Sequence, residues 1–339
     1  MRWRRGLLLL GAVIAIAVLF STTWTVVAIH VVAPRTTAGD LVAAVLGQEQ
    51  SQGALAEKLK GNRRVNLLLL ARGGAGDDNP DYTDTMLVLS IRPNPPQATV
   101  ISLPRYLWVD IPAPVDGSVP GKLYSAFAVG ASQDPGFLRP EWRTATGQGD
   151  LAAATIAATI GQPIDAWVAL DLRAFEALID AIGGIRITIP ETLDDPRYPS
   201  DQDEQTIHIH FDPGTQTLDG RQALQYARSR LSTSEADRSD RQELVLVAML
   251  SRLKTAGISP SLITAAGPLK DGLLTNLTPG GAKALLPIVA AIKPQDAVRI
   301  TLEDSPLLTL TTLGEDQPVL VPASGTYDAL QAFVAGKLP

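Results

Sequence analysis

The sequence predicts an α/β fold in which a central mixed β-sheet is flanked by helices in a three-layer α-β-α arrangement, preceded by one N-terminal transmembrane helix. Three observations predict it. Short apolar runs of strand length, bounded by Gly, Pro or charged residues, recur along the chain. Segments of helical composition lie between them, and interleaved strands and helices are typical of α/β domains. An uncharged run, residues 6–32, is long enough to cross a membrane.

The N-terminal run determines the expected topology. Residues 6–32 contain no Asp, Glu, Lys or Arg, and three arginines precede them. Because positive charge stays on the cytoplasmic side, we expect residues 1–5 in the cytoplasm, residues 6–32 as a single-pass signal anchor in the cell membrane, and the main domain outside. The alternative is a cleaved signal peptide. Pro34 follows the one small-residue cleavage site, Ala33, and argues against cleavage there.

Composition narrows the class of protein. The 339 residues carry a formal net charge of −6, which argues against nucleic acid as a partner. The chain has no cysteine, so disulfides, thiol catalysis and cysteine metal sites are excluded. Neither a Gly-x-Ser-x-Gly motif nor a Walker-type phosphate loop is present, which argues against a serine hydrolase and a P-loop enzyme.

The remaining elements are predicted in chain order. A stalk at 33–64 leads into one extracytoplasmic domain, residues 65–339, with a motif core at 65–255 and a C-terminal extension at 256–339. Apolar runs predict strands at 65–70, 86–91, 98–103, 109–111 (a short edge strand), 166–170, 185–189, 206–211 and 319–323. A turn at 93–96 joins the second and third as a hairpin. Helix formers and glycine stops predict helices at 151–160, 172–181, 221–226, 236–254 and 327–334.

Arginines gather in motifs that suit an anion. Arg238, Arg241 and Gln242 are spaced i, i+3, i+4 and share one face in the first turns of a predicted helix, where the helix dipole also favours an anion. We expect the predicted helix at 221–226 to unwind near Arg228. In an extended chain, Arg228 and Arg230 point the same way. Each guanidinium matches phosphate oxygens two at a time. Taken one at a time they are typical surface arginines, but several guanidinium groups that converged in one pocket would suit a diphosphate.

Six motifs in one order resemble the LytR-CpsA-Psr family over roughly residues 65–255. They are Asp84 before Thr85-Met86, Ser102-x-Pro104-Arg105, Ile182-Gly183-Gly184-Ile185, Leu218-Asp219-Gly220, the run from Ala223 to Arg230, and Arg238-x-x-Arg241-Gln242. The resemblance implies a membrane-anchored phosphotransferase outside the cell. It would move a glycopolymer from a polyprenyl-diphosphate carrier to peptidoglycan during cell-wall assembly, assisted by Mg²⁺.

The resemblance also implies roles for single residues. The diphosphate would be bound by Arg105, Lys122, Arg228, Arg230, Arg238, Arg241 and Gln242, and the catalytic set would be Asp84, Arg105, Arg228 and Arg230. Asp84 would bind Mg²⁺. The family's second aspartate is replaced by Gly73, so the second metal ligand stays open between Asp77, Asp78 and Asp81. Arg72 is a candidate to replace part of the metal's charge. Tyr106 and Tyr124 stand where the family has Asp and Asn.

Two other functions remain open. A diphosphatase would use water as the acceptor, and a non-catalytic envelope regulator would need no acceptor. The sequence identifies no general base for the acceptor hydroxyl. Asp84 could act as that base only if it does not bind the metal. His208 and His210 alternate on one predicted strand face and could hold Zn²⁺, but the sequence offers no third ligand nearby, so a solvated strand face is the interpretation we favour.

Overall fold

The computed structural model describes residues 55–73, 79–132, 134, 136–199, 206–229, 272–277, 279–292, 298–303, 305–313 and 317–338, with isolated positions between 237 and 252. Among these residues no helix has the length and apolar character needed to cross a membrane. The predicted anchor, residues 6–32, lies outside them, as does most of the stalk. Of the stalk, residues 55–64 are described, and residues 55–60 form a helix.

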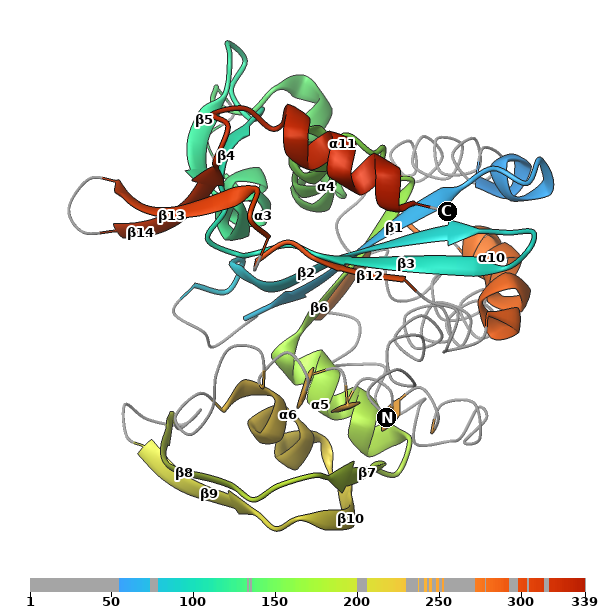
Figure 1. The fold of residues 1–339 in the computed structure, drawn as a ribbon, viewed down its shortest axis with the longest axis vertical. Helices are drawn as coiled ribbons and strands as arrows, with labels where there is room; N and C mark the ends of the chain where they lie inside the picture. The colour runs from blue at the N-terminus through green and yellow to red at the C-terminus, as the bar shows by residue number, and fades with distance from the viewer. Residues whose placement is uncertain are drawn as a thin grey trace.

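A six-stranded mixed sheet forms the centre of the molecule, in the order β11-β6-β1-β2-β3-β12 (Figure 1). Strand β1 runs parallel to β6 and β3 runs parallel to β12, while β1–β2, β2–β3 and β6–β11 are antiparallel. The mixed sheet predicted from the sequence is therefore confirmed. Its strands are β1 (Val65–Arg72), β2 (Thr83–Arg92), β3 (Gln97–Ser102), β6 (Ala166–Asp171), β11 (Leu273–Thr275) and β12 (Val298–Thr301).

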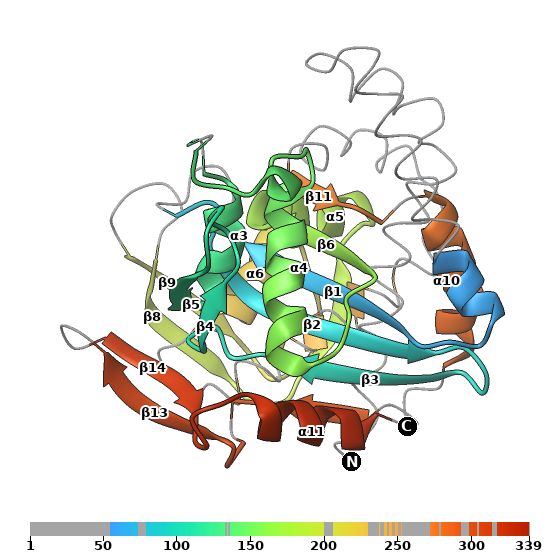
Figure 2. The same ribbon diagram turned by 90° about the horizontal axis from the view of Figure 1, so that it is seen from above.

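Helices cover both faces of this sheet, which is why β1 is apolar on both sides. Leu68 and Leu70 point into a core shared with α4 (Gly147–Ile160) and α11 (Asp328–Lys337). Leu67 and Leu69 point to the other face, where α10 (Pro279–Ala291) and residues 55–60 pack. In Figure 2, α4 crosses in front of the strands and α10 lies to the right of them. Buried leucines at consecutive positions are typical of a strand enclosed between two layers.

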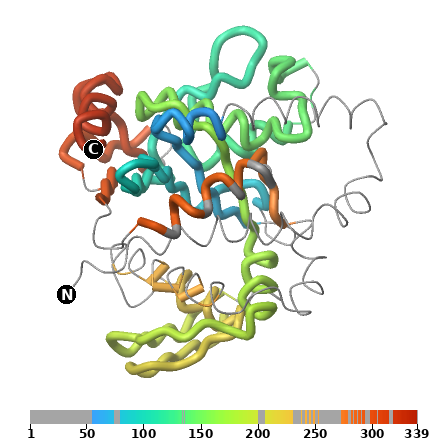
Figure 3. The backbone as a smooth tube through the Cα atoms, turned by 90° about the vertical axis from the view of Figure 1, so that its right-hand side faces the viewer, coloured from blue at the N-terminus to red at the C-terminus, as the bar shows by residue number. Residues whose placement is uncertain are grey.

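A second group of elements lies beside the main sheet, below it in Figures 1 and 3. Helix α5 (Leu172–Ala181) follows β6 directly and ends before Gly183 and Gly184, whose φ angles are 78° and 80°. Glycine adopts this left-handed conformation without strain. The group is completed by β7 (Ile185–Ile189), β8 (Leu193–Pro199), β9 (Thr206–Phe211), β10 (Gly214–Leu218) and α6 (Gly220–Arg228).

One predicted strand has a different neighbour from the one expected. Residues 109–111 belong to β4 (Trp108–Ile111), so the predicted short edge strand is confirmed, but it pairs with β5 (Val119–Lys122) in a separate two-stranded sheet and not with the main sheet. The turn after β3 redirects the chain before β4 starts. Other small elements frame the molecule: β13 (Leu308–Leu313), β14 (Gln317–Pro322), α3 (Ala126–Gly130) and the 3-10 turns η2 (Leu123–Ser125) and η3 (Pro140–Trp142).

Candidate functional site

Three of the predicted site residues come together at one end of the main sheet. Asp84 is the second residue of β2, Arg105 lies in the turn between β3 and β4, and Lys122 ends β5. Pairing of Trp108 with Lys122 places β5 beside that turn. The backbone N–H of Tyr124 donates to the carbonyl of Arg105 over 3.1 Å and closes the arrangement.

Asp84 sits at an irregularity in the β1–β2 ladder. Ala71 pairs with Thr85, but Arg72 pairs with Thr83, so Asp84 is the extra residue of a β-bulge. Bulges change the direction of a side chain relative to the regular pleat and are frequent beside active sites. The Asp84 carboxylate is 41% exposed and forms an ion pair with the Arg105 guanidinium. The bulge thus presents a partly solvated carboxylate to a predicted phosphate-binding arginine.

Tyrosine rings surround the Arg105 side chain. Its guanidinium carbon lies 4.8 Å from the centre of the Tyr106 ring and 5.2 Å from that of Tyr124. The Lys122 Nζ lies 5.2 Å from the same Tyr106 ring. Cations at these distances over an aromatic face are attracted by its quadrupole. Tyr106 and Tyr124, the two departures from the family pattern, therefore lie next to each other and both contact Arg105, which the sequence did not reveal.

Tyr124 is further enclosed by Tyr82, whose ring centre is 4.7 Å from its own. Burial raises the pKa of the Tyr124 phenol above its ordinary value, and the neighbouring phenols of Tyr82 and Tyr106 add to the rise, while Arg105 opposes it. The phenol therefore stays protonated around neutral pH. It can donate a hydrogen bond but does not act as a base there.

Arg72 ends β1 and is buried. Its guanidinium lies 3.6 Å from a carboxylate oxygen of Asp81 and 3.6 Å from one of Asp171, and it donates to the carbonyl of Pro80 over 3.4 Å. Two carboxylates thus face its single positive charge. Asp81, one of the three candidates for the second metal ligand, is thus engaged with Arg72, and Asp77 and Asp78 lie outside the described residues.

The second predicted group of arginines follows α6. Asp219 caps this helix in a reciprocal capping box with Gln222, and the helix ends at Arg228 because Ser229 turns to extended backbone (ψ 138°). The unwinding predicted near Arg228 is confirmed. Arg228 is half-buried on the last turn, while Arg230 and Arg238 lie outside the described residues.

Arg241 holds this helix end from the neighbouring segment. Its Nε donates to the carbonyl of Tyr226 over 2.9 Å and one terminal nitrogen donates to the carbonyl of Ser229. The side chain is buried. Contact of Arg241 with a diphosphate stays a prediction, but these two donors serve the chain itself. Gln242, the next residue, is half-buried. Convergence of Arg228 with Arg105 on one pocket also stays a prediction.

The fold and the site define an α/β protein in which cationic side chains and one exposed carboxylate gather at the end of a mixed sheet. The model of the LytR_cpsA_psr family matches residues 30–305. The chain belongs to the LytR-CpsA-Psr family, as its motifs predicted.

Two curated relatives share one functional name. The polyisoprenyl-teichoic acid–peptidoglycan teichoic acid transferase TagU of Oceanobacillus iheyensis is 31% identical over 217 residues, 63% of this chain and 58% of that protein. TagV of Bacillus subtilis, with the same transferase name, is 27% identical over 226 residues, 66% of this chain and 52% of that protein. The chain thus spans little more than half the length of these two relatives.

Solved structures share the fold. The crystal structure of Bacillus subtilis TagV superposes with a TM-score of 0.57 at 21% identity, covering 82% of this chain and 98% of that one. A structure of TagT bound to LI-WTA gives a TM-score of 0.57 at 21% identity, covering 82% and 92%. At this level of identity the likeness establishes the α/β architecture and no more.

Proposed function

We propose that this protein is a membrane-anchored phosphotransferase that moves a glycopolymer from a polyprenyl-diphosphate carrier to peptidoglycan outside the cell. The observation that carries the proposal is the group formed by Asp84, Arg105 and Lys122 in a chain of this family. Two cations and one accessible carboxylate are the side chains needed to hold a diphosphate with a divalent ion. The transferase name of the curated relatives supports the same reaction class.

Transfer of a phosphoryl group is catalysed mainly by neutralising negative charge in the transition state, and it needs no covalent intermediate on the protein. An acceptor hydroxyl of peptidoglycan attacks the phosphorus next to the sugar. A new P–O bond forms, the P–O bond to the other phosphate breaks, the polyprenyl monophosphate leaves, and the hydroxyl proton passes to water. Negative charge on the phosphoryl oxygens is neutralised by Arg105 and Lys122, whose positions are already set by the Tyr106 ring.

Arg105 is prepared for this role by its surroundings. Tyr106 and Tyr124 restrict its guanidinium, and its Nε, buried, has no hydrogen-bond partner among the described residues. A guanidinium held in one orientation loses less freedom when it binds phosphate oxygens in pairs. Arg228, Arg230 and Arg238, with Arg241 and Gln242 beside them, complete the proposed diphosphate pocket.

The residues present could hold Mg²⁺ through one protein carboxylate, that of Asp84. This ion prefers oxygen ligands and is usually held by one or two carboxylates together with phosphate oxygens and water. Asp84 offers one carboxylate that solvent reaches, and it shares that carboxylate with Arg105. The ion would be held by Asp84 and the substrate's own oxygens, where it would add positive charge next to the reacting phosphorus. Asp81 would join through a carboxylate that also faces Arg72.

The membrane part of the proposal rests on the sequence. Residues 6–32 are uncharged and follow three arginines, which supports an anchor that keeps the domain close to a lipid-linked substrate. Protease added to intact spheroplasts should then digest the C-terminal domain, and full protection would contradict this topology.

One assay separates the three candidate functions. Purified full-length chain is incubated with a polyprenyl-diphosphate oligosaccharide and Mg²⁺, with and without a peptidoglycan oligomer. Phosphodiester-linked product that requires the oligomer supports the transferase. Release of polyprenyl monophosphate at the same rate in both arms identifies a diphosphatase. An intact substrate in both arms favours the regulator and contradicts the proposal.

A further inference from the structure

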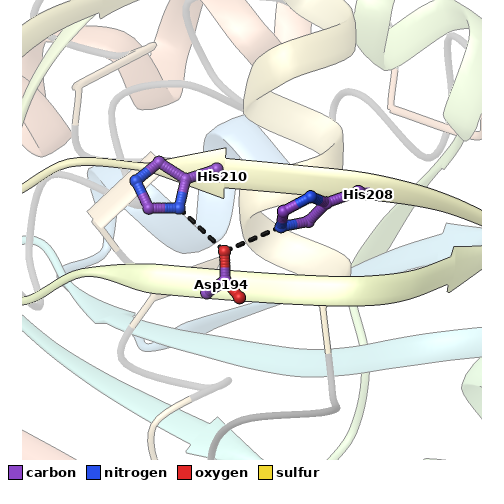
Figure 4. Close-up of side chains that lie close together, drawn as sticks. All are labelled: Asp194, His208 and His210. Atoms are coloured by element: carbon purple, nitrogen blue, oxygen red, sulfur yellow. Dashed lines mark hydrogen bonds and ion pairs between the residues drawn. The ribbon is translucent and has the colours of Figure 1, made fainter.

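Three potential metal ligands, Asp194, His208 and His210, lie together on the ribbon formed by β8 and β9 (Figure 4). One carboxylate oxygen of Asp194, Oδ1, lies 2.8 Å from Nε2 of His208 and 2.8 Å from Nδ1 of His210. The three ligand atoms all lie within 4.8 Å of one another. The third ligand that the sequence did not offer is therefore present, because it comes from the neighbouring strand.

The pairing of the two strands explains the arrangement. Asp194 lies directly opposite His210 in the antiparallel register, and His208 is two residues from His210 on the same strand. Side chains two apart point to one face of a strand, and direct cross-strand neighbours are close enough to interact. A register shift between Asp195 and Tyr198 lies opposite His208. The backbone alone therefore places these three side chains together.

The other face of the ribbon is fixed to the body of the protein. Ile209 and Phe211 are buried, and the Phe211 ring packs 5.4 Å from the ring of Tyr226 in α6. Asp195 is also buried and accepts a hydrogen bond from the Ser229 hydroxyl over 2.7 Å. The strand backbone that carries the three ligands is thus anchored from beneath, while the ligands face solvent.

A second carboxylate stands behind one of the histidines. His210 Nε2, the ring nitrogen that points away from Asp194, lies 3.3 Å from Asp212 Oδ1. Histidines that bind metals typically donate their other N–H to a carboxylate, which orients the ring and raises its basicity. Asp212 occupies that position for a metal bound through Nδ1. Burial does not block access, since the side chains of Asp194, His208 and His210 are 51%, 59% and 48% exposed.

We propose that Asp194, His208 and His210 form a surface site for a divalent transition metal of the zinc class. Asp194 Oδ1, His208 Nε2 and His210 Nδ1 are the protein ligands, Asp212 orients His210, and solvent completes the coordination. Two imidazoles with one carboxylate suit Zn²⁺ and related ions, whereas Mg²⁺ selects oxygen ligands. The site is thus separate in place and in chemistry from the magnesium role proposed for Asp84.

The composition of the chain makes this site testable without interference. There is no cysteine, and the chain contains three histidines in all, the third being His30 in the predicted anchor. Any imidazole-based affinity of the external domain therefore rests on His208 and His210. The metal displaces the hydrogen-bonding protons that now lie between these nitrogens and Asp194, so that binding releases protons to the buffer.

The experiment uses the full-length chain, purified in detergent without a polyhistidine tag and stripped with a chelator. Zn²⁺ is titrated calorimetrically, and Co²⁺ is titrated as a spectroscopic substitute by its visible absorption. We expect one ion per chain for the parent and loss of that ion in His208→Ala and in His210→Ala. Asp212→Asn should weaken the affinity about 10–100-fold. Asp116→Asn, an exposed aspartate elsewhere, is the matched control and should bind as the parent does.

Two results would overturn the site. One is a parent protein that takes up no Zn²⁺ beyond the amount bound by the double variant H208A/H210A. The other is parental affinity that persists in the double variant. The pair H208Q/H210Q, which keeps side-chain volume and hydrogen bonding, guards against a folding defect. Circular dichroism of both double variants should match the parent, because all of the replaced side chains are exposed.

Discussion

The Asp84 carboxylate is joined to the Arg105 guanidinium, and one of these residues is brought there by a bulge while the other is brought by a turn. The pair unites the predicted metal ligand with a predicted phosphate ligand. In the proposed reaction both groups work on the same diphosphate. Each can therefore be tested by a substitution that leaves the other in place.

Replacing Asp84 by Asn should reduce Mg²⁺-supported transfer by about 100-fold or more, the scale of losing one preorganised charge contact at a reacting centre. The free energy of unfolding should change by no more than about 1 kcal/mol, since the ion pair is partly exposed. Initial rates against Mg²⁺ concentration and urea denaturation supply the two readouts. Glu191→Gln, an exposed acidic residue in a loop, is the control. A variant with the parental rate and metal response would make Asp84 a structural residue.

Replacing Arg105 by Lys should lower kcat/KM for the diphosphate substrate by about tenfold to a hundredfold, because an ammonium keeps the charge but makes one charged hydrogen bond fewer. Arg105→Ala should lower it further. The comparison of Lys with Ala separates charge from the paired contact. Arg221→Lys on the exposed side of α6 should leave the rate unchanged. Equal rates for the parent and Arg105→Lys would exclude a paired contact.

The Tyr124 phenol should ionise later than an ordinary tyrosine. Its folded pKa is raised above the unfolded value of 10.0, chiefly by burial, so its contribution to stability is complete below pH 10.0 and is lost as pH rises through the folded pKa. The absorbance of tyrosinate, titrated in the parent and in Tyr124→Phe, isolates this group. A difference between the two curves centred at or below pH 10.0 would contradict the expectation.

Removing the buried Arg72 should destabilise the fold. Arg72→Met leaves the buried Asp171 without its positive partner, which typically costs about 3–5 kcal/mol. Asp171→Asn in the same chain removes that unbalanced charge, and an amide oxygen can still cap α5, so the double variant should recover part of the loss. Urea denaturation measures both, with the exposed Arg63→Ala as the control. A single variant as stable as the parent would show that the pair contributes nothing.

The elements that the sequence predicted well are those whose burial follows a simple period. Strands β1, β2, β3 and β6 lie between two layers and appear in the sequence as apolar runs. Helix α5 has the predicted bounds, 172–181, and its end agrees with the glycine stop that follows it. Strand β5 contains Pro120 and Gly121, and β8 contains Pro196. Their patterns are broken because they belong to narrow ribbons, where pairing matters more than burial.

The site was less predictable, because its geometry depends on pairings between distant segments. The bulge that sets the direction of Asp84 is a matter of register, which composition does not reveal. Tyr106 and Tyr124 are far enough apart in the chain that their shared contact with Arg105 appears only in the fold. Asp194 likewise joins the histidines of β9 across the ribbon. In each case the sequence shows the residue itself, but only the fold shows which residue it contacts.

The Asp171 carboxylate connects the main sheet with the group of elements beside it. Asp171 ends β6, and while one of its oxygens faces Arg72 at the end of β1, the other accepts the N–H of Ala174 over 2.7 Å in the first turn of α5. At this junction the end of strand β1 and the start of helix α5 are therefore held by the same carboxylate. We therefore expect a ligand that shifts the end of β1 to shift the start of α5 as well, because the Asp171 carboxylate contacts both.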